Sequence, residues 1–234
     1  MPRHQRAPLV PTAAGVLLLS ISAAALTTSD PRWWLSCFSR LGAMGDAASV
    51  LFNAGMVLAG ATIALVALPA RAGLRGAHGA GFRAQGSVAV LVPALIAALG
   101  LSLILIGLLP LSLSVYAHER AANGALASSA GLLLAHRLHL RGLSRALDRL
   151  AGGAVVVLVV GMIGLIAGVL SLTVFEALAF GAVIAWLNGL ERHLRRLRPA
   201  VPPSFTANSQ QFSLSPIWGT RRVGVRVRLT AGEC

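Results

Sequence analysis

The residues best suited to chemistry gather around one histidine. His118 and Glu119 are adjacent, and Asn123 follows Glu119 by four residues, which places Glu119 and Asn123 on one face of a helix. An imidazole beside a carboxylate can act as a general acid or base, so His118 and Glu119 are the candidate catalytic residues. One histidine and one carboxylate supply too few ligands for a usual zinc site, and no metal is predicted.

A second set of mostly polar residues has the spacing of one helix face. Asp46, Ser49, Asn53, Met56 and Gly60 recur at steps of three and four residues. Asn53 lies seven residues after Asp46, which on a helix is about 10 Å deeper. An amide in apolar surroundings must bond to another helix or to a ligand. A bond across the bundle is the favoured interpretation, and direct ligand binding is the alternative.

The polar residues lead to a short set of candidate sites. The ligand-binding candidates that these residues supply are Asp46, Asn53, His118 and Asn123. His136 and His139 have helical i, i+3 spacing, but two imidazoles beside arginines are more typical of a solvated helix end than of a metal site. The sequence has no GxSxG elbow, HExxH, Walker loop or GxGxxG fingerprint, and no cofactor is predicted.

The composition predicts that these residues are positioned by membrane helices. Hydrophobic residues make up 56% of the 234 residues and charged residues 12%, and the mean hydropathy is +0.77. The hydrophobic content is higher, and the charged content lower, than in ordinary soluble proteins. The net charge is +13 and every basic residue is arginine, but the arginines flank apolar segments. Nucleic acid is therefore not an expected partner.

The apolar segments predict an all-α bundle of six transmembrane helices in residues 1–198. A spanning helix needs about 20 residues. The predicted spans are 9–28, 47–70, 87–111, 117–135, 151–171 and 174–190. The last two come from one stretch of about 40 residues, which as a single helix would be about 60 Å long and must fold back. Glu176, its only charge, is expected near the outer turn.

The arginines predict the orientation of this bundle. Seventeen of the twenty fall before the first span, in alternate loops and after the sixth span, whereas Arg32, Arg40 and Arg120 fall in the other loops. Arginine-rich loops stay in the cytoplasm, so both termini are predicted to be cytoplasmic. An alternative for the first segment is a cleaved signal peptide, because small residues surround 23–25.

Two further segments are expected on the cytoplasmic side. Residues 137–150 place leucines on one side and charges largely on another, which predicts an interfacial amphipathic helix. The arginines of 192–198 lie close to the membrane, where anionic lipid headgroups are expected partners. Residues 199–234 carry no sustained period and predict a mostly disordered cytoplasmic tail.

One group of residues resembles a known family. The residues are Ser39, Leu41 and Gly42, then Phe52 and Asn53 with Gly55 and Gly60, and later Gly107, Pro110 and His118. Their pattern resembles that of bacterial six-span membrane proteins of unknown function, which are distantly allied to the eukaryotic DRAM autophagy modulators. The resemblance covers the spans but not the tail. It implies a bacterial plasma-membrane location, six spans rather than five, and an outer site shared by these residues and Asn53, which makes Ser39 a fifth ligand-binding candidate.

The predicted function follows from a polar outer rim without a full catalytic set. The rim comprises Asp30, Trp33, Trp34, Asp46, Tyr116, His118, Glu119 and Glu176. We expect a multi-pass envelope protein, more plausibly not an enzyme, that binds a membrane lipid or supports a membrane protein partner through an outward-facing polar pocket. One alternative is an intramembrane lipid-modifying enzyme that uses His118 as acid/base, oriented by Glu119 or Asp46. A second is a small transporter, although mid-span charges are lacking.

Overall fold

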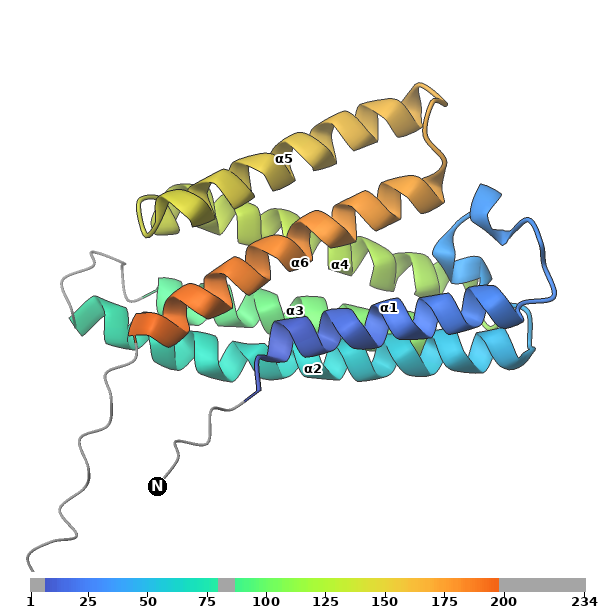
Figure 1. The fold of residues 1–234 in the computed structure, drawn as a ribbon, viewed down its shortest axis with the longest axis horizontal. Coiled ribbons are helices and arrows are strands. Elements are labelled where there is room, and N and C mark those ends of the chain that lie inside the picture. Colours follow the sequence, from blue (N-terminus) through green and yellow to red (C-terminus); the bar gives the residue numbers. More distant parts are fainter. Residues whose placement is uncertain (1–6, 80–86, 198–234) are drawn as a thin grey trace, which may run out of the picture. The chain divides into compact units, whose positions relative to one another are not determined.

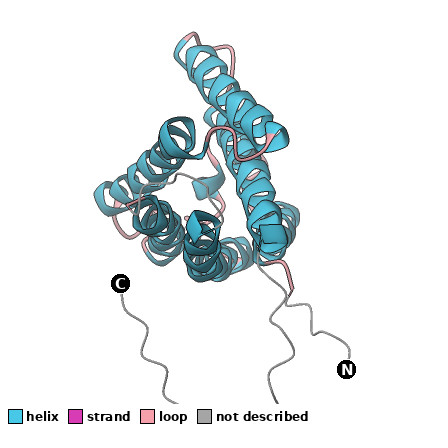
Figure 2. Ribbon diagram, turned by 90° about the vertical axis from the view of Figure 1, so that its left-hand side faces the viewer, coloured by secondary structure: helices cyan, strands magenta, loops and turns pink. Residues whose placement is uncertain are grey.

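The chain forms a helical bundle. A computed structural model describes residues 7–79 and 87–197, and these residues contain no strand, which confirms the all-α prediction. Figure 1 shows the long helices, and Figure 2 shows them joined by loops. They are α1 (Leu9–Thr27), α2 (Ala47–Gly79), α3 (Val88–Leu108), α4 (Val115–Ala135), α5 (Arg145–Ile166) and α6 (Leu172–Leu197). Short helical turns cover η1 (Trp33–Leu35), η2 (Phe38–Arg40) and η3 (His136–Leu140).

Five of these helices are long and apolar enough to cross a membrane. They are α1, α2, α3, α5 and α6. Helix α4 has 21 residues, like α3, but it is less apolar than α3. Its sequence contains His118, Glu119 and Arg120, together with two serines and several alanines. The described structure is thus that of a helical membrane protein in which five spans meet the requirement of length and hydropathy. The predicted tail, 199–234, lies outside the described residues.

The helix boundaries correct one sequence prediction. Residues 137–150 do not form one interfacial helix: α4 continues as a π-helical turn to Leu140, the chain turns, and α5 begins at Arg145. Gly142 permits this turn because its φ is +85°, a conformation that glycine adopts readily. Ser144 then caps α5 by accepting a hydrogen bond from the Leu147 amide. The leucines and charges of this segment therefore belong to two different helices.

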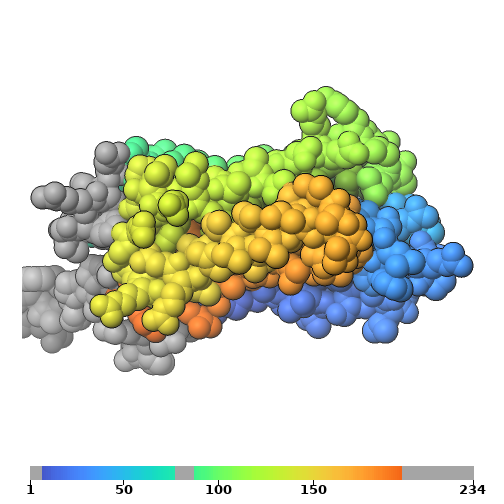
Figure 3. Space-filling view, turned by 90° about the horizontal axis from the view of Figure 1, so that it is seen from above, coloured from blue at the N-terminus to red at the C-terminus, as the bar shows by residue number. Residues whose placement is uncertain are grey.

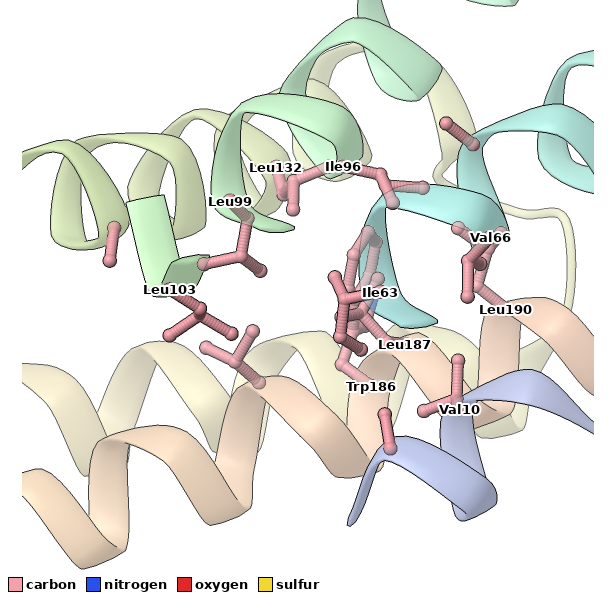
Figure 4. Packing of buried hydrophobic residues seen from close by; sticks show 14 of the residues in the cluster. Val10, Ile63, Val66, Ile96, Leu99, Leu103, Leu132, Trp186, Leu187 and Leu190 are labelled. Carbon is pink, nitrogen blue, oxygen red and sulfur yellow. The ribbon is translucent and has the colours of Figure 1, made fainter. Parts of the chain in front are cut away.

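Helices α2 and α3 approach closely because small residues face each other. A Cβ atom added at Gly60 would lie 2.6 Å from the carbonyl oxygen of Gly100 and 2.8 Å from the amide nitrogen of Ile104. The two backbones are therefore in direct contact, as small residues allow in membrane bundles. Ile63 and Ile96 are fully buried beside this crossing, in the apolar core shown in Figure 4.

Helices α5 and α6 form a hairpin, as the long apolar stretch predicts. Helix α5 ends at Ile166, Gly168 adopts a φ of +69°, and α6 begins at Leu172. A left-handed glycine after the last turn is a common way to end a helix. Figure 3 shows α5 on the outside of α6. Most of the α5 surface is therefore left for contact with lipid, and only Leu147, Ala151, Ala154 and Gly161 of this helix are buried.

The first and last helices are tied together by a buried carboxylate. Glu191 of α6 is only 5% exposed, and its two oxygens accept hydrogen bonds from the amides of Leu9 (3.0 Å) and Val10 (2.9 Å), in the first turn of α1. Arg195 donates to Glu191 (2.6 Å) and to the Ala7 carbonyl (2.7 Å). Free amides at a helix start attract negative charge, so Glu191 caps α1 from another helix.

Candidate functional site

His118 and Ser39 meet at the end of the bundle that holds the 28–46 loop. His118 lies in the first turn of α4, where Ser114 caps the helix by accepting from the Ala117 amide. Its Nδ1 lies 2.9 Å from the Leu109 carbonyl oxygen, and its Nε2 lies 2.8 Å from Ser39 Oγ. A carbonyl only accepts, so Nδ1 donates to it; in the neutral imidazole Nε2 then accepts from the serine hydroxyl.

This arrangement fixes the imidazole more firmly than the sequence indicates. His118 is 5% exposed, and the turn between α3 and α4 supplies its Nδ1 partner. Ser39 belongs to η2, in the loop between α1 and α2, 79 positions away in the chain. The bond therefore joins the 28–46 loop to the start of α4. It also leaves the hydroxyl of Ser39 in contact with a potential base, the chemical requirement for activating a serine.

Asn53 bonds within the protein, but its partner lies in the loop before its own helix and not across the bundle on another helix. Its amide nitrogen donates to the Gly42 carbonyl (3.1 Å), while its buried Oδ1 atom has no hydrogen-bond partner within the described residues. Gly42 packs so closely on Asn53 that a Cβ atom there would collide with Oδ1. Leu41, beside Gly42, is fully buried. The Ser39–Gly42 turn is thus anchored at one end by His118 and at the other by Asn53.

Asp46 has a capping role at the start of α2. One carboxylate oxygen accepts from the Ser29 amide (3.1 Å) and hydroxyl (3.0 Å), and the other accepts from the Ser49 amide (3.0 Å). The hydrogen bond from the Ser29 amide is the main reason that the pKa of Asp46 lies below its ordinary value. Asp46 therefore stays ionised and holds the 28–46 loop on α2. Its bonds run to Ser29 and Ser49, and His118 is bound elsewhere.

Glu119 and Asn123 lie on the exposed side of α4. Both ring nitrogens of His118 are already bonded, to Ser39 and to Leu109, so Glu119 does not orient this imidazole. The predicted pair of His118 and Glu119 is thus replaced by a pair of His118 and Ser39. Within residues 7–79 and 87–197, no three His, Cys, Asp or Glu side chains gather closely enough to hold a metal ion.

A large cavity begins beside Ser39. Its volume is about 420 Å³, and it lies among α1, α2, α4 and α6. Its wall is mostly apolar: Leu17, Leu18, Ile21, Phe52, Met56, Leu126, Leu158, Phe175, Phe180 and Val183 contribute to it. The polar contributors are Ser39, Asn123, Ser129 and Glu176. Of the five predicted ligand-binding residues, Ser39 and Asn123 line the cavity, whereas Asp46, Asn53 and His118 support the loops around it.

Glu176 is a cavity residue that sequence reasoning did not place in the site. It lies in the second turn of α6, near the outer turn as predicted, and its Oε2 atom accepts from the Phe38 amide (2.8 Å). Phe38 precedes Ser39, so the carboxylate holds the backbone on which Ser39 stands. The signal was present in the sequence, because Glu176 is the only charge in a stretch of about 40 apolar residues.

The cavity has the length of one membrane leaflet. Its wall on α6 runs from Leu172 to Ile184, a rise of about 18 Å on a helix. Half of a hydrocarbon core of about 30 Å is about 15 Å. Helices α1 and α6 are close where Glu191 caps α1 and diverge toward the end that holds the 28–46 loop (Figure 1).

A separate polar cluster lies at the opposite end of the bundle. His136 donates through Nε2 to the Asp148 carboxylate (3.1 Å), and its ring makes an edge contact with the fully buried Trp186. Burial lowers the pKa of His136, and the neighbouring carboxylate of Asp148 opposes this. Asp148 also accepts from the Gly142 amide. This cluster fixes the turn between α4 and α5 and is distant in the fold from Ser39.

Comparisons with known proteins return no relative for this chain: no protein-family model, curated protein or solved structure matches it. The resemblance to the six-span bacterial family therefore stays a prediction.

Proposed function

We propose that the protein is a multi-pass protein of the bacterial plasma membrane that binds a membrane lipid in the cavity between α1 and α6. In this proposal α4 also crosses the membrane, which makes six spans in total, and both termini are cytoplasmic. A helix of 21 residues is about 32 Å long, sufficient for the hydrocarbon core. The buried face of α4 carries His118, Ser128 and Ser129, whereas the exposed Glu119 and Arg120 lie in its first two turns, at the end of the bundle that holds the 28–46 loop.

The observation that carries the lipid proposal is the cavity itself. A mostly apolar wall about one leaflet long accommodates an acyl chain, and the polar groups Ser39 and Glu176 stand near the end where α4 and α6 begin, with Asn123 and Ser129 farther along α4. Lipid-binding sites need this combination, because the acyl chain must be shielded from water while the headgroup or ester region must keep polar contacts. The arginines of η3 and α5 supply a second, cytoplasmic contact, to anionic headgroups.

A cavity-filling substitution tests the proposal. Gly181 lines the cavity, and a Cβ atom added there meets no atom within 4 Å. Gly181→Trp should fill the cavity with little strain. The matched control is Gly153→Trp on the exposed side of α5, where an added Cβ is equally free.

The readout is the lipid that remains with the protein after extraction into detergent and gel filtration, identified by mass spectrometry. We expect one lipid class to be enriched over the bulk membrane in the wild type and in Gly153→Trp, and to be depleted at least about tenfold in Gly181→Trp. The same lipid composition in all three proteins, equal to that of the bulk membrane, would exclude the cavity as a lipid site.

A further inference from the structure

We propose that Ser39 and His118 form a serine acyl-transfer site that acts on an ester-linked acyl chain of a lipid held in the cavity. The inference rests on the proposed function, because the lipid in the cavity is its substrate. It assigns a nucleophile, Ser39, and a base, His118, whereas the sequence predicts Ser39 as a ligand-binding residue and His118 as an acid/base oriented by Glu119 or Asp46.

The geometry of the pair is that of an activated serine. Ser39 Oγ lies 2.8 Å from His118 Nε2, within the range for a serine and its general base. The Leu109 carbonyl, 2.9 Å from Nδ1, holds the ring in the tautomer that leaves Nε2 free to take a proton. In serine hydrolases an aspartate has this orienting role. Here a backbone carbonyl takes its place.

Access to the pair is one-sided. Ser39 lines the cavity, whereas His118 is buried behind it at 5% exposure. The hydroxyl therefore stands between the base and the space that a substrate would occupy. Ser39 also lies at the end of the bundle where α4 and α6 begin, near the level of lipid glycerol in the proposed orientation. A carbonyl of a glycerol ester reaches this level while its acyl chain extends into the apolar part of the cavity.

The charged groups around the pair fix its position. Glu176 of α6 holds the Phe38 amide, the backbone group beside Ser39. Arg40, next to Ser39 on the other side, pairs with Asp30 at 3.2 Å and is thereby drawn into the 28–46 loop. Asn123 contributes an amide of α4 to the wall of the same cavity.

The proposed step is balanced without a cofactor. Ser39 Oγ attacks the ester carbonyl carbon while its proton passes to His118 Nε2. The bond from the acyl carbon to the glycerol oxygen then breaks, and the proton moves from Nε2 to the leaving alkoxide. The products are a lipid alcohol and an acyl ester on Ser39. Water, or a second alcohol, attacks this ester with His118 again taking the proton, which releases the acyl group and restores the serine.

A fluorophosphonate probe, which reacts covalently with activated serines, tests the nucleophile on the full chain in detergent. We expect labelling of the wild type and its loss in Ser39→Ala. The matched control is Ser36→Ala, because Ser36 is an exposed serine in the same loop. Equal labelling of the wild type and Ser39→Ala, or no labelling of the wild type, would overturn the inference.

A thiol substitution tests the base separately. In a chain carrying Cys37→Ser and Cys234→Ser, Ser39→Cys places one thiol beside His118. An ordinary thiol has a pKa of about 8.5. An adjacent base favours the thiolate, so the thiol reacts at a lower pH. We expect alkylation by iodoacetamide at pH 7 to be at least about tenfold faster with His118 than with His118→Asn. Asparagine keeps a donor for the Leu109 carbonyl, so a structural role alone predicts equal rates and would overturn the inference.

The lipid analysis separates the two proposals. Enriched lipid together with an unlabelled Ser39 overturns the acyl-transfer site and leaves the proposed function standing. Labelling at Ser39 without enrichment of any lipid overturns the lipid substrate, and with it both proposals as stated.

Discussion

At the scale of single residues, the described fold depends on carboxylates that bind backbone amides. Glu191 binds the start of α1, Glu176 binds Phe38, and Asp46 binds Ser29. Each carboxylate lies on a different segment from the amide it satisfies, so each bond joins two elements. In apolar surroundings such a bond is costly to lose, because the amide is left without a partner.

Removal of the Glu191 carboxylate should destabilise the bundle. Glu191→Ala leaves the amides of Leu9 and Val10 without their acceptors, and we expect a loss of about 1–3 kcal/mol in the free energy of unfolding. The measurement is thermal or denaturant unfolding in detergent. Glu119→Ala is the control, since Glu119 is exposed on α4 and should change stability little. Equal effects of the two substitutions would contradict the capping role.

The sequence could name these residues but not their partners. Composition and helical spacing place Ser39, Asn53 and His118 at one end of the bundle, and this much is predictable. The pairing of Ser39 with His118 depends on how the loop between α1 and α2 folds over α4, which no periodicity encodes. The partners of Glu176 and Glu191 were not predictable for a related reason: they are backbone amides, which every residue except proline carries, and no sequence pattern reveals which of them a carboxylate will bind.

At the scale of elements, small residues decide how closely the helices pack. Hydropathy predicts the existence of the helices well, because about 20 apolar residues can span a membrane only as a helix. It does not predict that α5 begins at Arg145 or that α2 continues past Pro69 to Gly79, since those boundaries are set by local caps and by packing. The contact of Gly60 with Gly100 has the same origin.

A methyl group at the crossing of α2 and α3 should separate the two helices. Gly60→Ala would place its Cβ 2.6 Å from the Gly100 carbonyl oxygen, and we expect a loss of about 1–3 kcal/mol in unfolding free energy. The control is Gly76→Ala in the same helix, where the added atom meets nothing within 4 Å and should stabilise by up to about 1 kcal/mol. Unfolding of both variants in one detergent gives the comparison, and a neutral Gly60→Ala would contradict the close crossing.

At the scale of the whole molecule, the charges divide between the two ends of the bundle. Arg32, Arg40 and Arg120 lie at the end with the 28–46 loop, and the arginines of α2, η3, α5 and α6 lie at the other (Figure 1). This separation supports the proposed orientation, because arginine-rich ends stay in the cytoplasm. In the proposed orientation, the cavity and Ser39 face the outer side.

The two natural cysteines test this orientation. Cys37 is a partly exposed free thiol in the 28–46 loop, and Cys234 is the last residue of the chain. A membrane-impermeant maleimide applied to intact spheroplasts should label Cys37 and not Cys234, with Cys234 reacting only after lysis. Cys37→Ser and Cys234→Ser identify each signal. The reverse labelling would invert the topology and place the cavity on the cytoplasmic side.

The Glu191 bond also has a consequence for biosynthesis. Helix α1 leaves the ribosome first, yet the group that satisfies its opening amides is made almost at the end of the described chain. Until α6 arrives, the earliest segment has no partner for its leading turn. A chain truncated before residue 191 should therefore be cleared by membrane proteases, and completion of the last helix is what locks the first in place.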